Sequence, residues 1–141
     1  MNLFDTDGCM EDVGPGYRMR RHEVYNWGTF DGAVWSFELG GNTSLLTGEI
    51  GSGKSTMVDA ILTLLIPQPK INYNKAADSG SRERTLTSYV RGYYAKRSNE
   101  SGEEEPVALR DKNKYSVILA VFCDAEKDSY VTLAQVFYFQ P

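Results

Sequence analysis

Cysteine and histidine are scarce in this sequence, and their scarcity excludes several kinds of site. The chain of 141 residues contains two cysteines and one histidine. These are too few soft ligands for a zinc cluster built from this chain alone. A framework of disulfides is not expected either, and the low cysteine content favours a reducing, cytoplasmic location.

Long hydrophobic runs are also missing. The longest, residues 117–123, has seven residues, whereas a membrane-spanning helix needs about 20 apolar residues. Residues 1–16 contain four acidic and no basic side chains, so they are unlike a secretory signal. We therefore expect no membrane association, an acidic flexible arm at 1–16 and a folded lobe at 17–141.

Positive charge is in slight deficit. Fifteen Lys and Arg stand against nineteen Asp and Glu, a formal net charge of −4. A surface of this kind does not attract nucleic acid as a whole, so a DNA contact would need a local patch or residues outside this chain. The 41% of apolar residues can bury a core, and the length suits one domain or part of one.

One glycine-rich segment carries most of the functional information. Residues 48–56 read Gly-Glu-Ile-Gly-Ser-Gly-Lys-Ser-Thr and match the phosphate-binding loop G-x-x-x-x-G-K-[ST], the Walker A motif. Its glycines let successive backbone N–H groups turn inward around a phosphate. Lys54 would place its charge on the β- and γ-phosphates, Ser55 would offer its hydroxyl to Mg²⁺, and the following helix would point its positive end at the same anion. The predicted nucleotide-binding residues are Gly48, Glu49, Ile50, Gly51, Ser52, Gly53, Lys54, Ser55 and Thr56.

The residues on either side of the loop fit this interpretation. Residues 43–47 read as a short buried strand. After the loop, apolar residues recur at helical spacing, and the predicted inward face consists of Met57, Val58, Ile61, Leu62 and Leu65. Pro67 and Pro69 are expected to end this helix. Strand, glycine loop and helix form the arrangement that the motif requires, whereas a Gly/Ser turn that precedes a helix by chance would explain the loop alone.

The other expected elements place the loop after a third strand. The expected strands cover residues 18–25, 33–39, 43–47, 115–123 and 130–139. Turns are expected at residues 26–32 and 40–42, a short helix at 86–94, and a charged solvated loop at 95–114. The chain stops inside or just after a strand and is expected to be an incomplete lobe.

Three stretches carry a resemblance to a known family. Residues 24–32 read Val-Tyr-Asn-Trp-Gly-Thr-Phe-Asp-Gly, residues 45–60 contain the phosphate loop, and residues 71–77 read Ile-Asn-Tyr-Asn-Lys-Ala-Ala. Two strands before the loop are the plan of the ABC-type ATPase head, and the Asn-aromatic-x-x-Phe turn is typical of SMC-like chains. Over residues 17–141 the sequence resembles the SMC-like ATPases of the MukB and JetC (Wadjet, or MksB) type.

The resemblance implies an α/β fold of the P-loop NTPase class, namely the N-terminal half of an ABC/SMC-type ATPase head with an antiparallel β subdomain. The family's C-terminal half supplies the signature motif, the Walker B aspartate and the catalytic glutamate, and two heads sandwich two ATP molecules. The implied cofactors are ATP and Mg²⁺. The implied partners are a second SMC-like head, a kleisin, winged-helix subunits and DNA, in chromosome segregation or plasmid defence. Since neither a Ser-Gly-Gly signature nor a heptad region is present here, we expect the isolated chain to be inactive.

A second apolar run offers an alternative to the SMC-like interpretation. Residues 117–124 end in Asp124 and mimic a Walker B strand. If Asp124 held Mg²⁺, the chain would be a stand-alone P-loop kinase or GTPase. The six-residue connection 124–129 is too short for the crossover of a parallel sheet, which favours a hairpin with Asp124 in its polar turn. A fragment that binds nucleotide without activity is the other alternative.

Three more residues are candidates near the nucleotide. Asn26 could support the loop through hydrogen bonds. Gln135 could sense Mg²⁺ and the γ-phosphate, although a polar position on a half-exposed strand explains it as well. Trp27 could stack near the adenine, or it could belong to the core, as aromatic residues in turns more often do.

Overall fold

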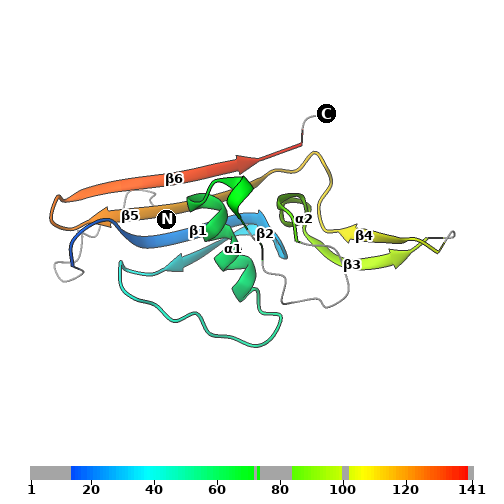
Figure 1. The fold of residues 1–141 in the computed structure, drawn as a ribbon, viewed down its shortest axis with the longest axis horizontal. Coiled ribbons are helices and arrows are strands. Elements are labelled where there is room, and N and C mark those ends of the chain that lie inside the picture. Colours follow the sequence, from blue (N-terminus) through cyan, green and yellow to red (C-terminus); the bar gives the residue numbers. More distant parts are fainter. Residues whose placement is uncertain (1–13, 72, 74–83, 100–101, 140–141) are drawn as a thin grey trace.

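A four-stranded antiparallel sheet forms the centre of the molecule (Figure 1). The computed structural model describes residues 14–71, 73, 84–99 and 102–139. The sheet has the order β2-β1-β5-β6, and its strands are β1 (Arg18–Trp27), β2 (Phe30–Glu38), β5 (Ser116–Asp124) and β6 (Ser129–Phe137). The two predicted strands before the loop and the two near the end of the sequence are therefore confirmed. The first two extend further into residues 26–32 than expected, since only the short link 28–29 separates them.

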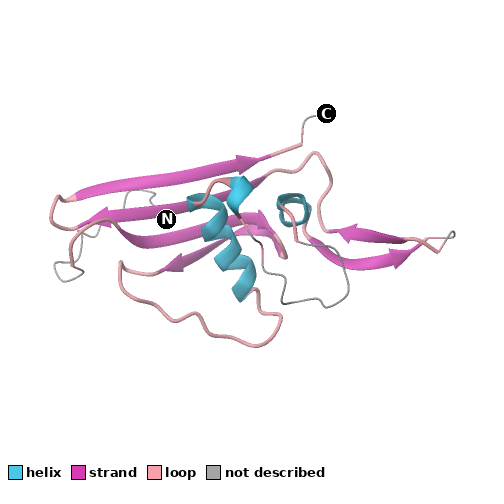
Figure 2. Ribbon diagram, in the orientation of Figure 1, coloured by secondary structure: helices cyan, strands magenta, loops and turns pink. Residues whose placement is uncertain are grey.

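Helix α1 (Lys54–Leu65) lies across one face of this sheet (Figure 2). It ends before Pro67 as predicted, and the 3₁₀ turn Gln68–Lys70 follows. None of the helices in the described part of the chain is long and apolar enough to cross a membrane. The buried core joins α1, the sheet and the short helix α2 (Leu86–Arg91), and it consists of Val24, Trp27, Met57, Ala60, Leu64, Tyr89, Val90, Ile118 and Ala120.

The predicted inward face of α1 was only partly right: Met57 is buried and Ile61 and Leu62 are half-buried, but the other two residues are exposed. Val58 and Leu65 are 47% and 48% exposed, whereas the buried residues are Thr56, Met57, Asp59, Ala60, Thr63 and Leu64. Small and hydrogen-bonding side chains make this contact because they allow the helix to approach the sheet closely and to pair its buried polar groups. The apolar pattern alone therefore predicted a stripe of the helix next to the one that is buried.

The expected strand at residues 43–47 is also absent. These residues have no regular structure and are exposed, with Leu45 87% exposed. The edges of the sheet are β2 and β6, so among the described residues no strand pairs with this segment. A parallel strand needs neighbours to satisfy its backbone groups, and the segment crosses the surface without them.

The charged region after α2 forms a hairpin, not a loop. Strands β3 (Tyr93–Ser98) and β4 (Glu104–Ala108) pair antiparallel and project from the body of the molecule (Figure 1). Gly92 ends α2 in a left-handed conformation with φ 64°, which glycine adopts without strain. The predicted helix over 86–94 therefore stops at Arg91, while the expected exposure of the following residues is confirmed.

Cys123, near the end of β5, is disulfide-bonded. One bonded cysteine is not a framework of disulfides, so the expectation that the chain has no such framework is not contradicted. The expected reducing, cytoplasmic location stays a prediction. The proposed arm at 1–16 and the resemblance at 71–77 lie largely outside the described residues.

Candidate functional site: the phosphate loop

The segment before α1 has the geometry of an anion-binding loop. Gly53 is the N-cap of α1, with φ 91° and no side-chain capping bond. The first amides of a helix lack partners within the helix, and they carry its positive dipole end. Residues 48–52 are exposed. The first turn of α1 is therefore open to a ligand that accepts hydrogen bonds, such as a phosphate.

Two glycines in the loop are required for different reasons. A Cβ added at Gly53 would lie 2.7 Å from the Phe30 ring, so the close packing of loop against ring depends on glycine. A Cβ at Gly51 would meet nothing within 4 Å, but its φ of 86° disfavours other residues. The backbone can thus curve here as a phosphate cradle requires.

The ammonium group of Lys54 lies inside this curve. Its Nζ donates to the carbonyl oxygens of Gly48 and Glu49, each at 2.6 Å, and contacts Ser52 Oγ at 3.4 Å. An ammonium has three donors and no acceptor, so these contacts engage all of them. The charge therefore lies against the backbone of the loop, and the half-buried Ser55 follows directly at the start of α1. These residues fit a nucleotide phosphate with Mg²⁺.

The end of β1 and the link that follows it support the start of α1. The fully buried Trp27 donates from Nε1 to the Thr56 carbonyl at 3.0 Å and stacks on Tyr89, with centroids 4.9 Å apart. A Cβ at Gly28 would lie 2.5 Å from Thr56 Cγ2. Trp27 therefore belongs to the core, and the alternative of an adenine-stacking Trp27 was wrong because no face of the indole is open.

A buried polar network continues from Trp27. Tyr89 donates its hydroxyl hydrogen to the Asp59 carboxylate in α1 and accepts from Arg84 at 3.1 Å. Burial, together with the bond to Asp59, raises the pKa of Tyr89 well above its usual range. Tyr89 therefore stays protonated as a donor at neutral pH, which ties α2 to the helix that follows the loop.

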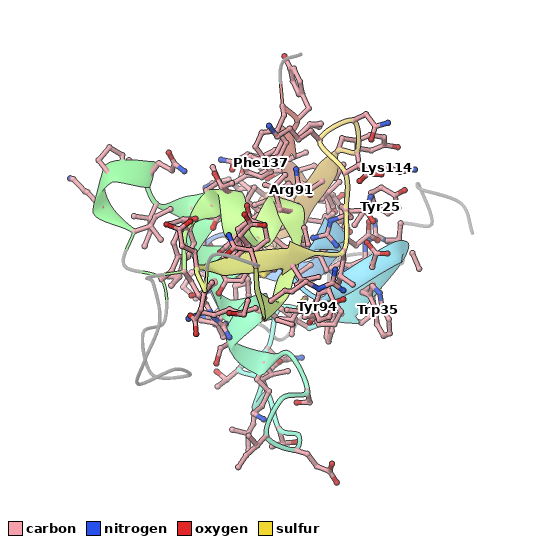
Figure 3. The ribbon with its side chains drawn as sticks, turned by 90° about the vertical axis from the view of Figure 1, so that its right-hand side faces the viewer. Tyr25, Trp35, Arg91, Tyr94, Lys114 and Phe137 are labelled. Carbon is pink, nitrogen blue, oxygen red and sulfur yellow. The ribbon has the colours of Figure 1, made fainter. Side chains whose placement is uncertain are left out.

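Phe30 and Trp35 are aromatic neighbours of the loop that our sequence analysis missed. Phe30 packs under Gly53, and its ring centroid lies 5.3 Å from that of Trp35. Trp35 is 47% exposed and lies on β2 at the margin of the molecule (Figure 3). An exposed tryptophan one ring away from the loop can report ligand binding by its fluorescence. Only the structure shows how close Trp35 lies to the loop.

The other two candidates lie elsewhere. The side chain of Asn26 donates to the Tyr115 carbonyl at 3.0 Å and accepts from the Gly32 amide at 2.9 Å. Asn26 thus shapes the turn, and its expected hydrogen bonds to the loop are not made. Gln135 pairs with Ile118 in the sheet register and is half-buried. Its role as a Mg²⁺ sensor stays a prediction.

Asp124 lies at the far end of the sheet from the loop. β5 and β6 are antiparallel and join at Asp124↔Ser129, as the hairpin interpretation predicted. Cys123 pairs with Arg18 at the start of β1, whereas the loop adjoins the region after Trp27. The 10 residues of β1 separate these ends by roughly 30 Å at about 3.3 Å per residue. Lys127 lies 2.9 Å from the carboxylate and holds the pKa of Asp124 below its usual range.

Asp124→Asn should leave the Mg·ATP affinity within about threefold of wild type, since the side chain lies far from the loop. The substitution should lower stability at neutral pH, because the ionised carboxylate is paired with Lys127. A group with a depressed pKa in the folded state stabilises above its unfolded pKa and loses this effect as the pH falls through the folded value. The stability difference between the two proteins should therefore shrink in acid. Calorimetric titration and urea unfolding at several pH values measure both effects, and a large loss of affinity with intact circular dichroism would contradict this placement.

Comparison with known proteins agrees with this geometry. A family model described as the P-loop containing region of an AAA domain matches residues 19–80. Over these residues the chain is similar to the P-loop region of an AAA domain. The matched residues contain most of β1, all of β2, the loop and α1. No curated protein matches the chain.

Proposed function

We propose that this chain binds Mg·ATP as the N-terminal, Walker A half of an SMC-like ATPase head. The observation that carries the proposal is the Lys54 ammonium held within a glycine loop at the open start of α1. Two antiparallel strands precede the loop, which agrees with the ABC-type plan and differs from that of small kinases and GTPases. The resemblance at residues 24–32, 45–60 and 71–77 supports the narrower assignment to the MukB and JetC type.

Each residue of the loop would have a defined role. The backbone amides of residues 49–54 and the Lys54 ammonium would bind the phosphates, and Ser55 would bind Mg²⁺. In the completed head the bond between the β- and γ-phosphates would be hydrolysed. A glutamate outside this chain would activate the water, and a second head, a kleisin, winged-helix subunits and DNA would be the partners. We place the complete protein in the cytoplasm, in chromosome organisation or plasmid defence.

Exposed apolar residues near the loop support the idea of a second half. Leu45, Ile50 and Val58 are 87%, 104% and 47% exposed, and they lie before, within and after the loop. Soluble monomers rarely expose neighbouring apolar side chains without a partner that covers them. A further segment that packs here would also give residues 43–47 a strand to pair with.

The rival enzyme, a stand-alone P-loop kinase or GTPase, requires Asp124 at the Mg²⁺ site. The hairpin at the far end of the sheet argues against it. A fragment that only binds nucleotide remains the second candidate, favoured by the absence of a Ser-Gly-Gly signature from the sequence.

The isolated chain should release phosphate from Mg·ATP no faster than the uncatalysed background. The reason is that the proposal assigns the activation of water to a glutamate outside this chain. A phosphate-release assay with Lys54→Ala as the matched control tests this. Steady turnover that disappears in Lys54→Ala would show a complete catalytic set and would favour the compact enzyme.

A further inference from the structure

Arg110 is buried between segments that are distant in the sequence. It lies in the connection between β4 and β5, in a charged stretch that the sequence analysis expected to be solvated. Its side chain is only 3% exposed. Charged side chains are seldom buried to this extent unless their donors are paired, so the partners of Arg110 indicate what it does.

The guanidinium joins the end of α2 to residues 28–31, which are the link between β1 and β2 and the first residues of β2. On the α2 side, Nε donates to the Val90 carbonyl at 2.9 Å and Nη2 to the Tyr89 carbonyl at 2.8 Å. On the other side, Nη2 also donates to the Gly28 carbonyl at 2.8 Å. Nη1 donates to the Asp31 carboxylate at 2.8 Å and contacts the Phe30 carbonyl at 3.4 Å. These five acceptors match the five N–H donors of the planar group.

The packing around Arg110 leaves little freedom. A Cβ at Gly92 would lie 2.6 Å from both Arg110 Nη2 and the Gly28 carbonyl oxygen. The Gly28 amide in turn donates to the Tyr89 carbonyl at 2.8 Å. The link between β1 and β2 is thus held from both its amide and its carbonyl side.

This link and Phe30 at the start of β2 support the phosphate loop. Phe30 packs under Gly53, and Gly28 packs under Thr56. A shift of the link would therefore move the residues on which Gly53 and the first turn of α1 rest. Ligand-binding groups lose affinity when the residues that support them allow displacements beyond about 0.5 Å.

We propose that Arg110 is a positioning residue of the nucleotide site: it fixes residues 28–31, and these fix the phosphate loop. This inference rests on the nucleotide binding proposed above. Lysine cannot replace Arg110, because its three donors sit on one atom and cannot reach the α2 carbonyls and Asp31 together.

Arg110→Lys should weaken the binding of Mg·ATP about tenfold per folded molecule, since the support of the loop becomes looser. Arg97→Lys on the exposed strand β3 is the matched control and should bind as wild type does. Calorimetric titration well below the melting temperature gives the affinity, and circular dichroism gives the folded fraction. A folded Arg110→Lys with wild-type affinity would overturn the inference, because a purely structural role would lower the melting temperature alone.

A double-mutant cycle with Phe30→Leu tests the route of the effect. Since both residues act through the same link, their combined loss of affinity should be clearly smaller than the sum of the two single losses. Additive losses would overturn the inference. If Arg110→Lys does not fold, Asp31→Ala replaces it, because Asp31 is 44% exposed and its substitution is better tolerated. The loss of this carboxylate should weaken the binding of Mg·ATP about threefold through the same guanidinium. Unchanged affinity in Asp31→Ala would refute the inference. Absence of binding by wild type would instead refute the proposed function.

Discussion

Lys54→Ala is expected to weaken the binding of Mg·ATP by about 100-fold. The ammonium is the one side-chain charge within the described part of the loop that can neutralise the β- and γ-phosphates. Charge-assisted hydrogen bonds of this kind contribute roughly 3 kcal/mol, and about 1.4 kcal/mol corresponds to a factor of ten. The removal of contacts to Gly48, Glu49 and Ser52 would also loosen the loop.

Calorimetric titration measures this loss directly, and the fluorescence of the exposed Trp35 provides a second signal. Lys70→Ala is a suitable control, since Lys70 is exposed beyond the other end of α1. Wild-type affinity in Lys54→Ala would show that the loop does not bind phosphate in the manner proposed.

Trp27→Ala should lower the free energy of unfolding by about 3–5 kcal/mol, the usual loss for a large buried aromatic side chain. Trp27 is 0% exposed, stacks on Tyr89 and contacts Phe137. Its loss would also leave the Thr56 carbonyl without the donor that it has at 3.0 Å. The change removes contacts to both helices and to β6 at once.

Urea denaturation followed by circular dichroism measures this effect. The chain has two tryptophans, so Trp35→Ala is a matched control at a site that is 47% exposed, where a loss of no more than about 1 kcal/mol is expected. Similar losses in the two variants would mean that Trp27 is not central to the core.

Local features were predictable from the sequence. The spacing of glycines and Lys54 indicated the phosphate loop, because its geometry depends on neighbours in the chain. The six-residue connection after Asp124 predicted an antiparallel hairpin, since connection length alone excludes a crossover. Pro67 marked the end of α1 for the same kind of local reason. Runs of strand-forming residues predicted the four strands of the sheet, which the structure contains.

Features that depend on distant partners were not predictable in this way. The inward face of α1 is set by contacts with distant elements: Trp27 of β1 donates to the Thr56 backbone carbonyl, and Tyr89 of α2 donates to the Asp59 carboxylate. Residues 43–47 have a strand-like composition, yet no neighbouring strand is described for them. A strand exists only when another strand satisfies its backbone groups.

The sequence by itself determined that this protein has a P-loop and which residues form it, because the motif is continuous and its chemistry is local. Only the tertiary structure decided what the loop rests on. Phe30, Trp35 and Arg110 lie outside the motif in the sequence, and nothing in their local sequence marks them. Arg110 in particular resembles a solvated charge, and its role depends on acceptors in the link after β1, in β2 and in α2 that come together only when the chain folds.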